Sequence, residues 1–166
     1  MNLNALPPPE AEAVFLTCCG SRAWARRMAE GRPYPDTAAL VAAGDRIWGS
    51  LAPEDWREAF AAHPSIGGKF GERKGGGEDR FRRWSEEEQA GVASAEEALL
   101  ADLAEANRSY AERFGYIFIV CATGKSAEEM LALLRSRLSN DSETELSVAA
   151  EEQQKITRLR LLKAES

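Results

Sequence analysis

"SEEEQAGVASAEEALLADLAEANRSYAERFG", residues 85–115, is the longest stretch of this chain that follows a single periodic pattern. Its apolar residues recur three and four positions apart, as they do along one face of an α-helix. Gly115 supplies a common end for a helix, and Gly91 is expected to kink or divide it. A helix of this length favours an α-helical fold.

Shorter stretches on both sides repeat the helical pattern. Ser21 is expected to cap a helix that Gly31 closes, and Pro53 lies in the first turn of another helix. Further helices are expected over residues 11–19, around 40–48, from 126 to about 138 and from 142 onward. The last two begin with capping-box patterns, formed by Ser126 with Glu129 and by Ser142 with Glu145.

Residues 116–126, "YIFIVCATGKS", contain the one β-like apolar run. Its length and periodicity leave two alternatives open, a short strand or a buried link between helices. A single strand cannot build a sheet. We therefore predict an all-α fold, a single-domain compact helical bundle of about seven to nine helices that spans residues 1–166.

Composition excludes several classes of function. The 166 residues carry a net charge of −6 at pH 7, which argues against nucleic acid as the main partner. No run approaches the ~20 uncharged apolar residues of a membrane span, and the N-terminus lacks the pattern of a secretory signal. No membrane partner and a cytoplasmic location are therefore expected. Cys18, Cys19 and Cys121 form neither a disulfide framework nor a zinc set, so we expect reduced, buried thiols.

His63 is the only histidine of the chain, and it lies in "AHPSIGGKFGE", residues 62–72. Pro64 should end the preceding helix at His63. Two interpretations remain open, an imidazole that merely ends a helix and the acid/base of an active site. Glu88 also has two possible interpretations. It could form a capping box with Ser85, or its carboxylate could bind the imidazole, because His63 and Glu88 flank the same glycine-rich stretch 64–80.

The sequence lacks the motifs that several other classes of site require. "CATGKS" resembles part of a P-loop, but Ile119 occupies a position where that loop requires glycine. One histidine cannot build a multi-histidine metal site. The nucleophile-elbow pattern G-x-S-x-G does not occur in the sequence. Acid/base chemistry at His63 remains.

Four stretches together resemble the 2-oxo-4-hydroxy-4-carboxy-5-ureidoimidazoline (OHCU) decarboxylases. They are "HPSIGGKF" (63–70), "SEEEQAG" (85–91), "ANRSYAERFGYIFIVCATGKSAEEML" (106–131) and "ELSVAAEEQQKITRLRLLK" (145–163). The resemblance implies an all-helical fold, often a homodimer, and a small-molecule substrate of urate degradation. It implies that OHCU loses CO2 to give (S)-allantoin without a metal or an organic cofactor, since the C=N bond of the substrate ring accepts the electrons that CO2 leaves behind.

The resemblance also implies a role for particular residues. His63 corresponds to the catalytic histidine, and Glu88 to a partner carboxylate that holds its ring. Arg160 is expected to bind the substrate anion, in preference to Arg158, which lies roughly 200° away around a helix. The remaining substrate-binding residues are expected to be Pro64, Ser85, Glu86, Glu87, Gln89, Phe118, Ile119, Val120, Cys121 and Ala122, the last five through backbone groups.

Two alternatives stay open beside this reading. In a helical binding module without enzymatic activity, His63 and Glu88 would serve only as helix caps, and their substitution would be tolerated. A decarboxylase that acts on a related ureide would show weak activity on OHCU and turnover of a neighbouring metabolite.

Overall fold

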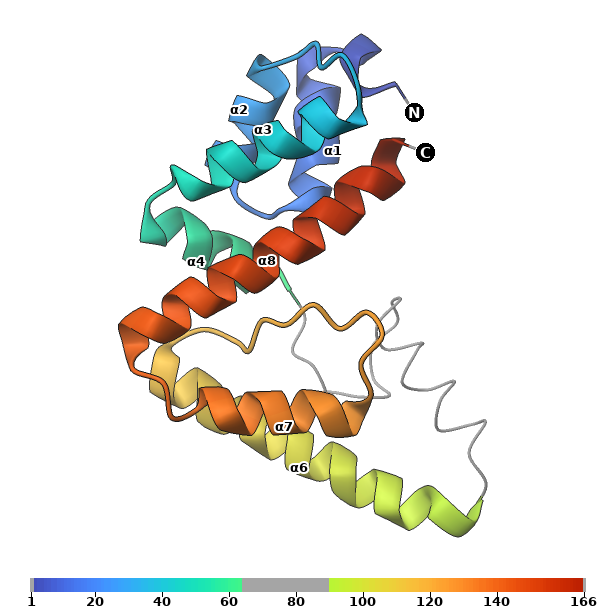
Figure 1. Cartoon of the computed structure of the whole chain (residues 1–166), viewed down its shortest axis with the longest axis vertical. Helices are drawn as coiled ribbons and strands as arrows, with labels where there is room; N and C mark the ends of the chain where they lie inside the picture. The colour runs from blue at the N-terminus through green and yellow to red at the C-terminus, as the bar shows by residue number, and fades with distance from the viewer. Residues whose placement is uncertain (1, 64–89, 166) are drawn as a thin grey trace. The chain divides into compact units, whose positions relative to one another are not determined.

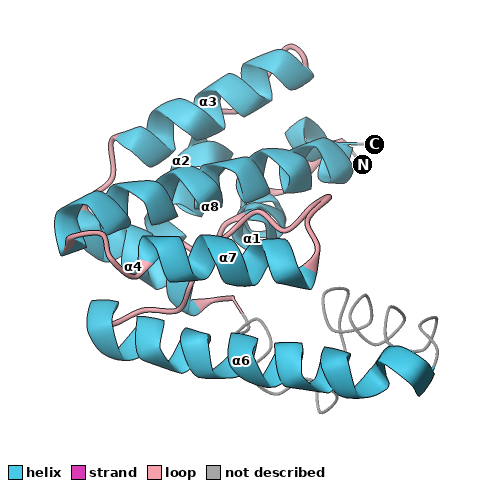
Figure 2. Cartoon of the chain, turned by 60° about the horizontal axis from the view of Figure 1, so that its bottom comes forward, coloured by secondary structure: helices cyan, strands magenta, loops and turns pink. Residues whose placement is uncertain are grey.

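A computed structural model describes residues 2–63 and 90–165, with side chains for 2–63 and 96–165. The regular elements of these residues are all helical, as Figure 2 shows, so the predicted all-α class is confirmed. They are η1 (Leu3–Ala5), α1 (Pro8–Cys18), α2 (Arg22–Glu30), α3 (Thr37–Gly49), α4 (Pro53–Ala61), α6 (Ala90–Phe114), α7 (Ala127–Arg137) and α8 (Ser142–Glu165). None of these helices combines the length and apolar character that a membrane span requires.

The described residues divide between two compact units. The first consists of Met1–His63, Ile119–Cys121 and Leu146–Ser166, and the second of Pro64–Phe118 and Ala122–Glu145. The first unit therefore combines η1 and α1–α4 with most of α8, as Figure 1 shows. Segments from both ends of the sequence build this unit.

Large apolar side chains fill the core of the first unit. Phe15 of α1 and Trp24 of α2 meet edge to face, with ring centroids 6.0 Å apart, and both are fully buried. Trp48 of α3 donates from its indole nitrogen to the carbonyl oxygen of Ala150 in α8, at 3.0 Å. Buried indole N–H groups need such an acceptor. The hydrogen bond of Trp48 therefore fixes α8 against α3.

Local signals determine where the helices of this unit begin and end. The Ser21 hydroxyl accepts the N–H of Trp24 at 3.2 Å, Gly31 follows the last residue of α2, and Pro53 is the first residue of α4. Gly20, between α1 and α2, lies close to the end of α4, because a Cβ on Gly20 would meet the Cβ of Ala62 at 2.5 Å. The absence of a side chain at Gly20 thus allows the segment before His63 to pack closely.

The second unit contains a buried cluster of charged and aromatic side chains. Arg137 of α7 donates from Nη2 to Oε2 of Glu145 at 2.5 Å, and Tyr110 of α6 donates to the same oxygen. The guanidinium of Arg137 lies 4.4 Å from the ring centroid of Phe118. Burial, and then the carboxylate of Glu145, raise the pKa of Tyr110, so its hydroxyl stays protonated.

This cluster corrects one expectation about the last helix. Glu145 was expected to complete a capping box with Ser142, but its carboxylate binds Arg137 and Tyr110 instead. Asp141 caps α8, because its carboxylate accepts the N–H of Thr144 at 2.7 Å. At the start of α7 the predicted capping box of Ser126 and Glu129 is confirmed.

The apolar run after α6 is a buried link and not a strand. Gly115, with a φ of +85°, ends α6 as predicted, and residues 116–122 follow without regular structure. Phe118, Ile119 and Val120 are buried along this link. Gly91 is the second residue of α6 and does not interrupt it within the described range.

Candidate functional site

His63 follows the last turn of α4. Its backbone N–H donates to the carbonyl oxygen of Phe60 at 3.2 Å, which continues the turn by one residue. Its imidazole is half-buried, and Nε2 lies 2.6 Å from Oε1 of Gln153 in α8. A single short hydrogen bond therefore joins the end of α4 to the middle of α8 within the first unit.

Gln153 is itself held in place by a second hydrogen bond. Its side chain is fully buried, and Nε2 donates to Oγ1 of Thr157, one turn further along α8, at 3.0 Å. The Thr157 hydroxyl also hydrogen-bonds the thiol of Cys19 at the end of α1. We call this chain of four side chains, His63, Gln153, Thr157 and Cys19, the His63 network.

Gln153 and Thr157 were not predicted as site residues. Their spacing carries a signal, because residues 153, 157 and 160 are four and three positions apart and so share one face of α8. Two polar side chains are unusual on the buried face of a helix, which here also carries Leu161. Their position is explained by His63, 90 residues earlier in the chain, whose ring binds Gln153.

Burial dominates the electrostatics of the His63 network. Desolvation lowers the pKa of His63, and the positive charge of Arg160 lowers it further, whereas the hydrogen bond to Gln153 opposes the shift. Burial likewise raises the pKa of the Cys19 thiol to about 11. At neutral pH the network therefore holds a neutral imidazole and a neutral thiol. The expectation of reduced, buried cysteines is confirmed for Cys18, Cys19 and Cys121.

The two candidate arginines of α8 differ in their surroundings. Arg158 forms a two-pronged ion pair with Asp45 of α3, with Nη2 2.7 Å from Oδ2 and Nε 3.0 Å from Oδ1. Arg160 is exposed, and its charge acts on His63, Cys18 and Cys19. The guanidinium of Arg158 is thus engaged in packing α8 on α3, while that of Arg160 is exposed near the His63 network.

The run from Phe118 to Ala122 is divided between the two units. Ile119, Val120 and Cys121 belong to the first unit with His63, whereas Phe118 and Ala122 belong to the second. The backbone N–H of Cys121 donates to Oε1 of Glu152 at 2.9 Å. Glu152 precedes Gln153, so neighbouring residues of α8 bind Cys121 and His63.

Six of the expected site residues lie outside the described side chains. They are Pro64, Ser85, Glu86, Glu87, Glu88 and Gln89. The expected pairing of His63 with Glu88 is therefore untested. Within residues 2–63 and 96–165, no group of three His, Cys, Asp or Glu side chains is arranged to hold a metal ion.

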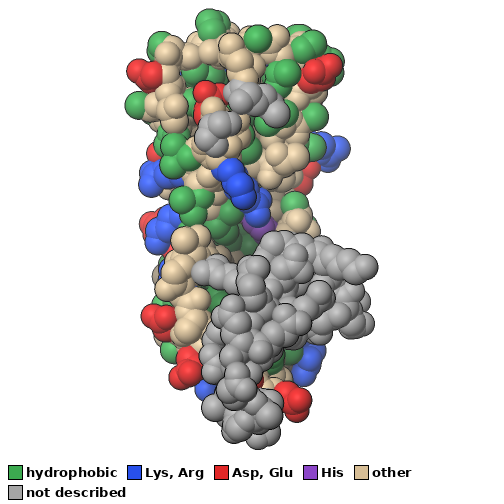
Figure 3. All heavy atoms as spheres, turned by 90° about the vertical axis from the view of Figure 1, so that its right-hand side faces the viewer, with side chains coloured by type: hydrophobic (Ala, Val, Ile, Leu, Met, Phe, Trp, Pro, Cys, Tyr) green, Lys and Arg blue, Asp and Glu red, His purple; other side chains and the backbone are tan. Residues whose placement is uncertain are grey.

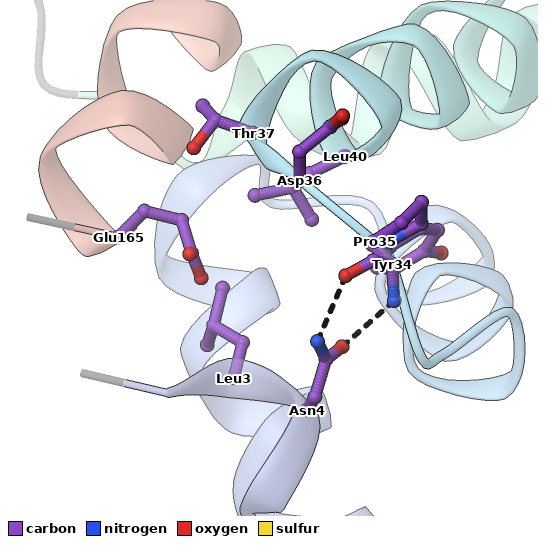
Figure 4. A pocket seen from close by; sticks show the side chains of 8 residues that line it. All are labelled: Leu3, Asn4, Tyr34, Pro35, Asp36, Thr37, Leu40 and Glu165. Carbon is purple, nitrogen blue, oxygen red and sulfur yellow. Dashed lines mark hydrogen bonds between the residues drawn. The ribbon is translucent and has the colours of Figure 1, made fainter.

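A pocket of about 240 Å³ lies elsewhere in the first unit, near the start of α3 (Figure 4). Two of its polar side chains are engaged within the protein, since the Asn4 amide binds both backbone groups of Tyr34 at 2.9 Å and the Asp36 carboxylate caps α3. Among the described side chains on the face drawn in Figure 3, acidic and basic groups are interspersed. We assign no ligand to either feature.

Comparison with known proteins gives consistent matches. The family model described as OHCU decarboxylase matches residues 4–162. The chain is 39% identical over 152 residues to the uric acid degradation bifunctional protein TTL of Arabidopsis thaliana, covering 92% of this chain but only 46% of that protein. It is 33% identical over 131 residues to the 2-oxo-4-hydroxy-4-carboxy-5-ureidoimidazoline decarboxylase of Amia calva, covering 79% and 73%.

Two solved structures also resemble the chain. A crystal structure of OHCU decarboxylase in the presence of (S)-allantoin is 34% identical, with a TM-score of 0.73, and the match covers 90% of this chain and 95% of that one. A structure of (S)-allantoin synthase, 20% identical with a TM-score of 0.67, matches in fold over 97% of this chain and 52% of that one.

Proposed function

Because the chain belongs to the OHCU decarboxylase family, we propose that it removes CO2 from OHCU and yields (S)-allantoin in urate degradation. The observation that carries the proposal is His63, the single imidazole of the chain, which is half-buried and held neutral in the unit that also contains Arg160. Proton transfer near neutral pH is the chemistry for which such a ring is suited.

The reaction places few demands on the protein. The bond between carbon 4 and the carboxylate breaks, its electron pair moves toward the neighbouring C=N bond, and CO2 leaves. One proton is taken up overall, and no electron acceptor other than the substrate is needed. The protein must orient the carboxylate, exchange a proton and deliver a proton to one face of the ring, so we propose that it requires neither a metal nor an organic cofactor.

We assign roles in accordance with these demands. His63 exchanges a proton with the 4-hydroxyl or the carboxylate of the substrate, and Glu88 stabilises the ring when it is charged. The guanidinium of Arg160 binds the substrate anion through charge-assisted hydrogen bonds. The remaining substrate-binding residues are those of the sequence prediction, with Ile119, Val120 and Cys121 supported by their place in the same unit as His63. We propose further that the protein is a homodimer located in the cytoplasm.

A direct experiment generates OHCU in situ from urate with urate oxidase and hydroxyisourate hydrolase, and follows the product by circular dichroism. Spontaneous decay gives racemic allantoin, so the protein should produce a signal of one hand and at a higher rate. An unchanged trace would refute the proposal. Activity should persist in the presence of a chelator, and strong inhibition would contradict the absence of a metal.

Variants separate this proposal from its alternatives. His63→Gln and Glu88→Gln should each lose most of the rate while far-ultraviolet circular dichroism stays unchanged. A helical binding module would tolerate both substitutions. Turnover of a neighbouring ureide with little activity on OHCU would instead identify a related decarboxylase. A sedimentation measurement tests the homodimer.

A further inference from the structure

We propose that Gln153, oriented by Thr157, fixes the tautomer of His63, so that the neutral ring carries its proton on Nε2 and presents the lone pair of Nδ1. This inference rests on the proposed function for its role in catalysis. The tautomer itself depends only on the His63 network. Gln153 is then a positioning residue, which acts on the reaction through His63.

The argument begins at the far end of the His63 network. A hydroxyl has one proton to donate and two lone pairs that accept. In the structure this oxygen, Oγ1 of Thr157, is the acceptor for Nε2 of Gln153, which lies 3.0 Å away.

The orientation of the Gln153 amide follows from this. Toward Thr157 it must present its NH2 group, the donor, and therefore it presents its carbonyl oxygen to His63. An amide oxygen only accepts, so the nitrogen 2.6 Å from it, Nε2 of His63, must carry a proton. Because burial keeps the ring neutral, it holds one proton only, and Nδ1 is bare.

The burial of the two α8 residues makes this arrangement stable. Gln153 is fully buried and Thr157 is 6% exposed, so water does not compete for their hydrogen bonds. Rotating the amide of Gln153 while Nε2 keeps its proton would place the NH2 group against that N–H, a contact between two donors. Loss of that bond inside the protein would cost about 1–3 kcal/mol.

The assignment changes the expected part of Glu88. A carboxylate accepts hydrogen bonds, and the neutral ring has no second N–H to donate to it. Only the charged imidazolium can donate to Gln153 and to a carboxylate together. Glu88 therefore contributes after His63 has taken up a proton, and Gln153 is the residue that orients the resting ring.

The single histidine makes the tautomer directly measurable. Protein labelled with isotopic nitrogen in the histidine ring gives one pair of imidazole resonances, and long-range proton–nitrogen correlations above the pKa of the ring distinguish the two tautomers. The wild-type protein should show the Nε2–H form. Observation of the Nδ1–H form would overturn the inference, whatever the activity.

Variants test whether Gln153 is the cause. Gln153→Met keeps the length of the side chain but cannot accept strongly, so it should give a mixture of tautomers and lower kcat by about 10- to 100-fold, with KM nearly unchanged. Gln153→Glu still accepts from Nε2–H and should restore the single tautomer with a raised pKa. Thr157→Val removes the hydroxyl without changing the shape and should produce a smaller fraction of the wrong tautomer.

Gln154→Met is the matched control, since it makes the same substitution one residue along α8 and should leave the spectrum and kcat unchanged. If Gln153→Met keeps both the wild-type tautomer and kcat, Gln153 has no positioning role. If Gln153→Met does not fold, the wild-type spectrum and Thr157→Val decide the question. A protein without decarboxylase activity whose tautomer still depends on Gln153 would refute the proposed function and support the network.

Discussion

Gly20 controls how closely the end of α4 approaches α1, and its replacement by alanine tests that control. A Cβ at this position would lie 2.5 Å from the Cβ of Ala62 and 3.6 Å from two backbone atoms of Ala59. The first distance is far inside van der Waals contact, whereas the second is ordinary. Because Ala62 precedes His63, we predict that Gly20→Ala both destabilises the fold and displaces the imidazole from Gln153.

Two opposing contributions set the magnitude. Forcing a methyl group into a packed site costs about 1–3 kcal/mol. Alanine also restricts the unfolded chain, which recovers about 0.4–1 kcal/mol, since Gly20 is not among the described residues with positive φ. The free energy of unfolding should therefore fall by about 0.5–2 kcal/mol, which corresponds to a decrease in Tm of about 1–8 °C for a chain of this size.

A double-mutant cycle isolates the clash. Urea unfolding followed by far-ultraviolet circular dichroism would compare the wild type, Gly20→Ala, Ala62→Gly and the double variant. Ala62→Gly removes the atom that the new methyl group at position 20 would meet. The double variant should therefore be about 1 kcal/mol more stable than the sum of the two single effects predicts. Gly49→Ala is the control: a Cβ there meets nothing within 4 Å, so this change near the end of α3 should stabilise the protein slightly. Strict additivity of the two single changes would refute the steric argument.

Further predictions concern charged groups. Glu145→Gln removes the carboxylate that forms an ion pair with the buried guanidinium of Arg137, and it should lower the free energy of unfolding by about 3–5 kcal/mol in urea titrations; a loss below about 1 kcal/mol would contradict this. Because the pKa of His63 is lowered in the folded protein, the unfolded chain binds the proton more readily. The free energy of unfolding should therefore decrease as pH drops through 6.5, by at most about 1.4 kcal/mol per pH unit from this residue. His63→Gln should lack this pH-dependent contribution. Arg158→Ala should cost at most about 1 kcal/mol of stability and little activity, because its ion pair is half-exposed. Arg160→Ala should leave stability nearly unchanged and raise KM for OHCU about tenfold or more, whereas equal effects of the two alanine variants on KM would contradict the assignment.

Local signals in the sequence predicted much of the fold. The caps at Ser21 and Ser126, the proline that starts α4 and the glycine that ends α6 all have the expected roles, because each acts through backbone groups a few residues away. The capping box predicted at Ser142 does not form, and the local sequence does not reveal the reason. A buried arginine on α7 binds the carboxylate of Glu145, and Asp141 supplies the cap instead.

The site shows the same division between local and distant information. His63 could be singled out from its type and its place before Pro64, but the groups that bind its ring could not. Gln153 is separated from it by 90 residues, and a polar side chain on a helix has many possible partners until the packing is known. The apolar link after α6 was undecided for a related reason. A buried extended segment and a strand share the same composition, and only the absence of a neighbouring strand distinguishes them within the described residues.

The hydrogen bond between Trp48 and Ala150 spans 102 residues, and it has a consequence for the order of events on the ribosome. Residues 1–63 leave the ribosome long before 146–165, yet both segments are needed to close the first unit. Until α8 emerges, the indole of Trp48 lacks its acceptor, and the apolar face that α8 later covers is open to other chains. Nascent α1–α4 should therefore depend on chaperones, and ribosome-bound chains stalled before residue 146 should bind them more strongly than chains that include α8.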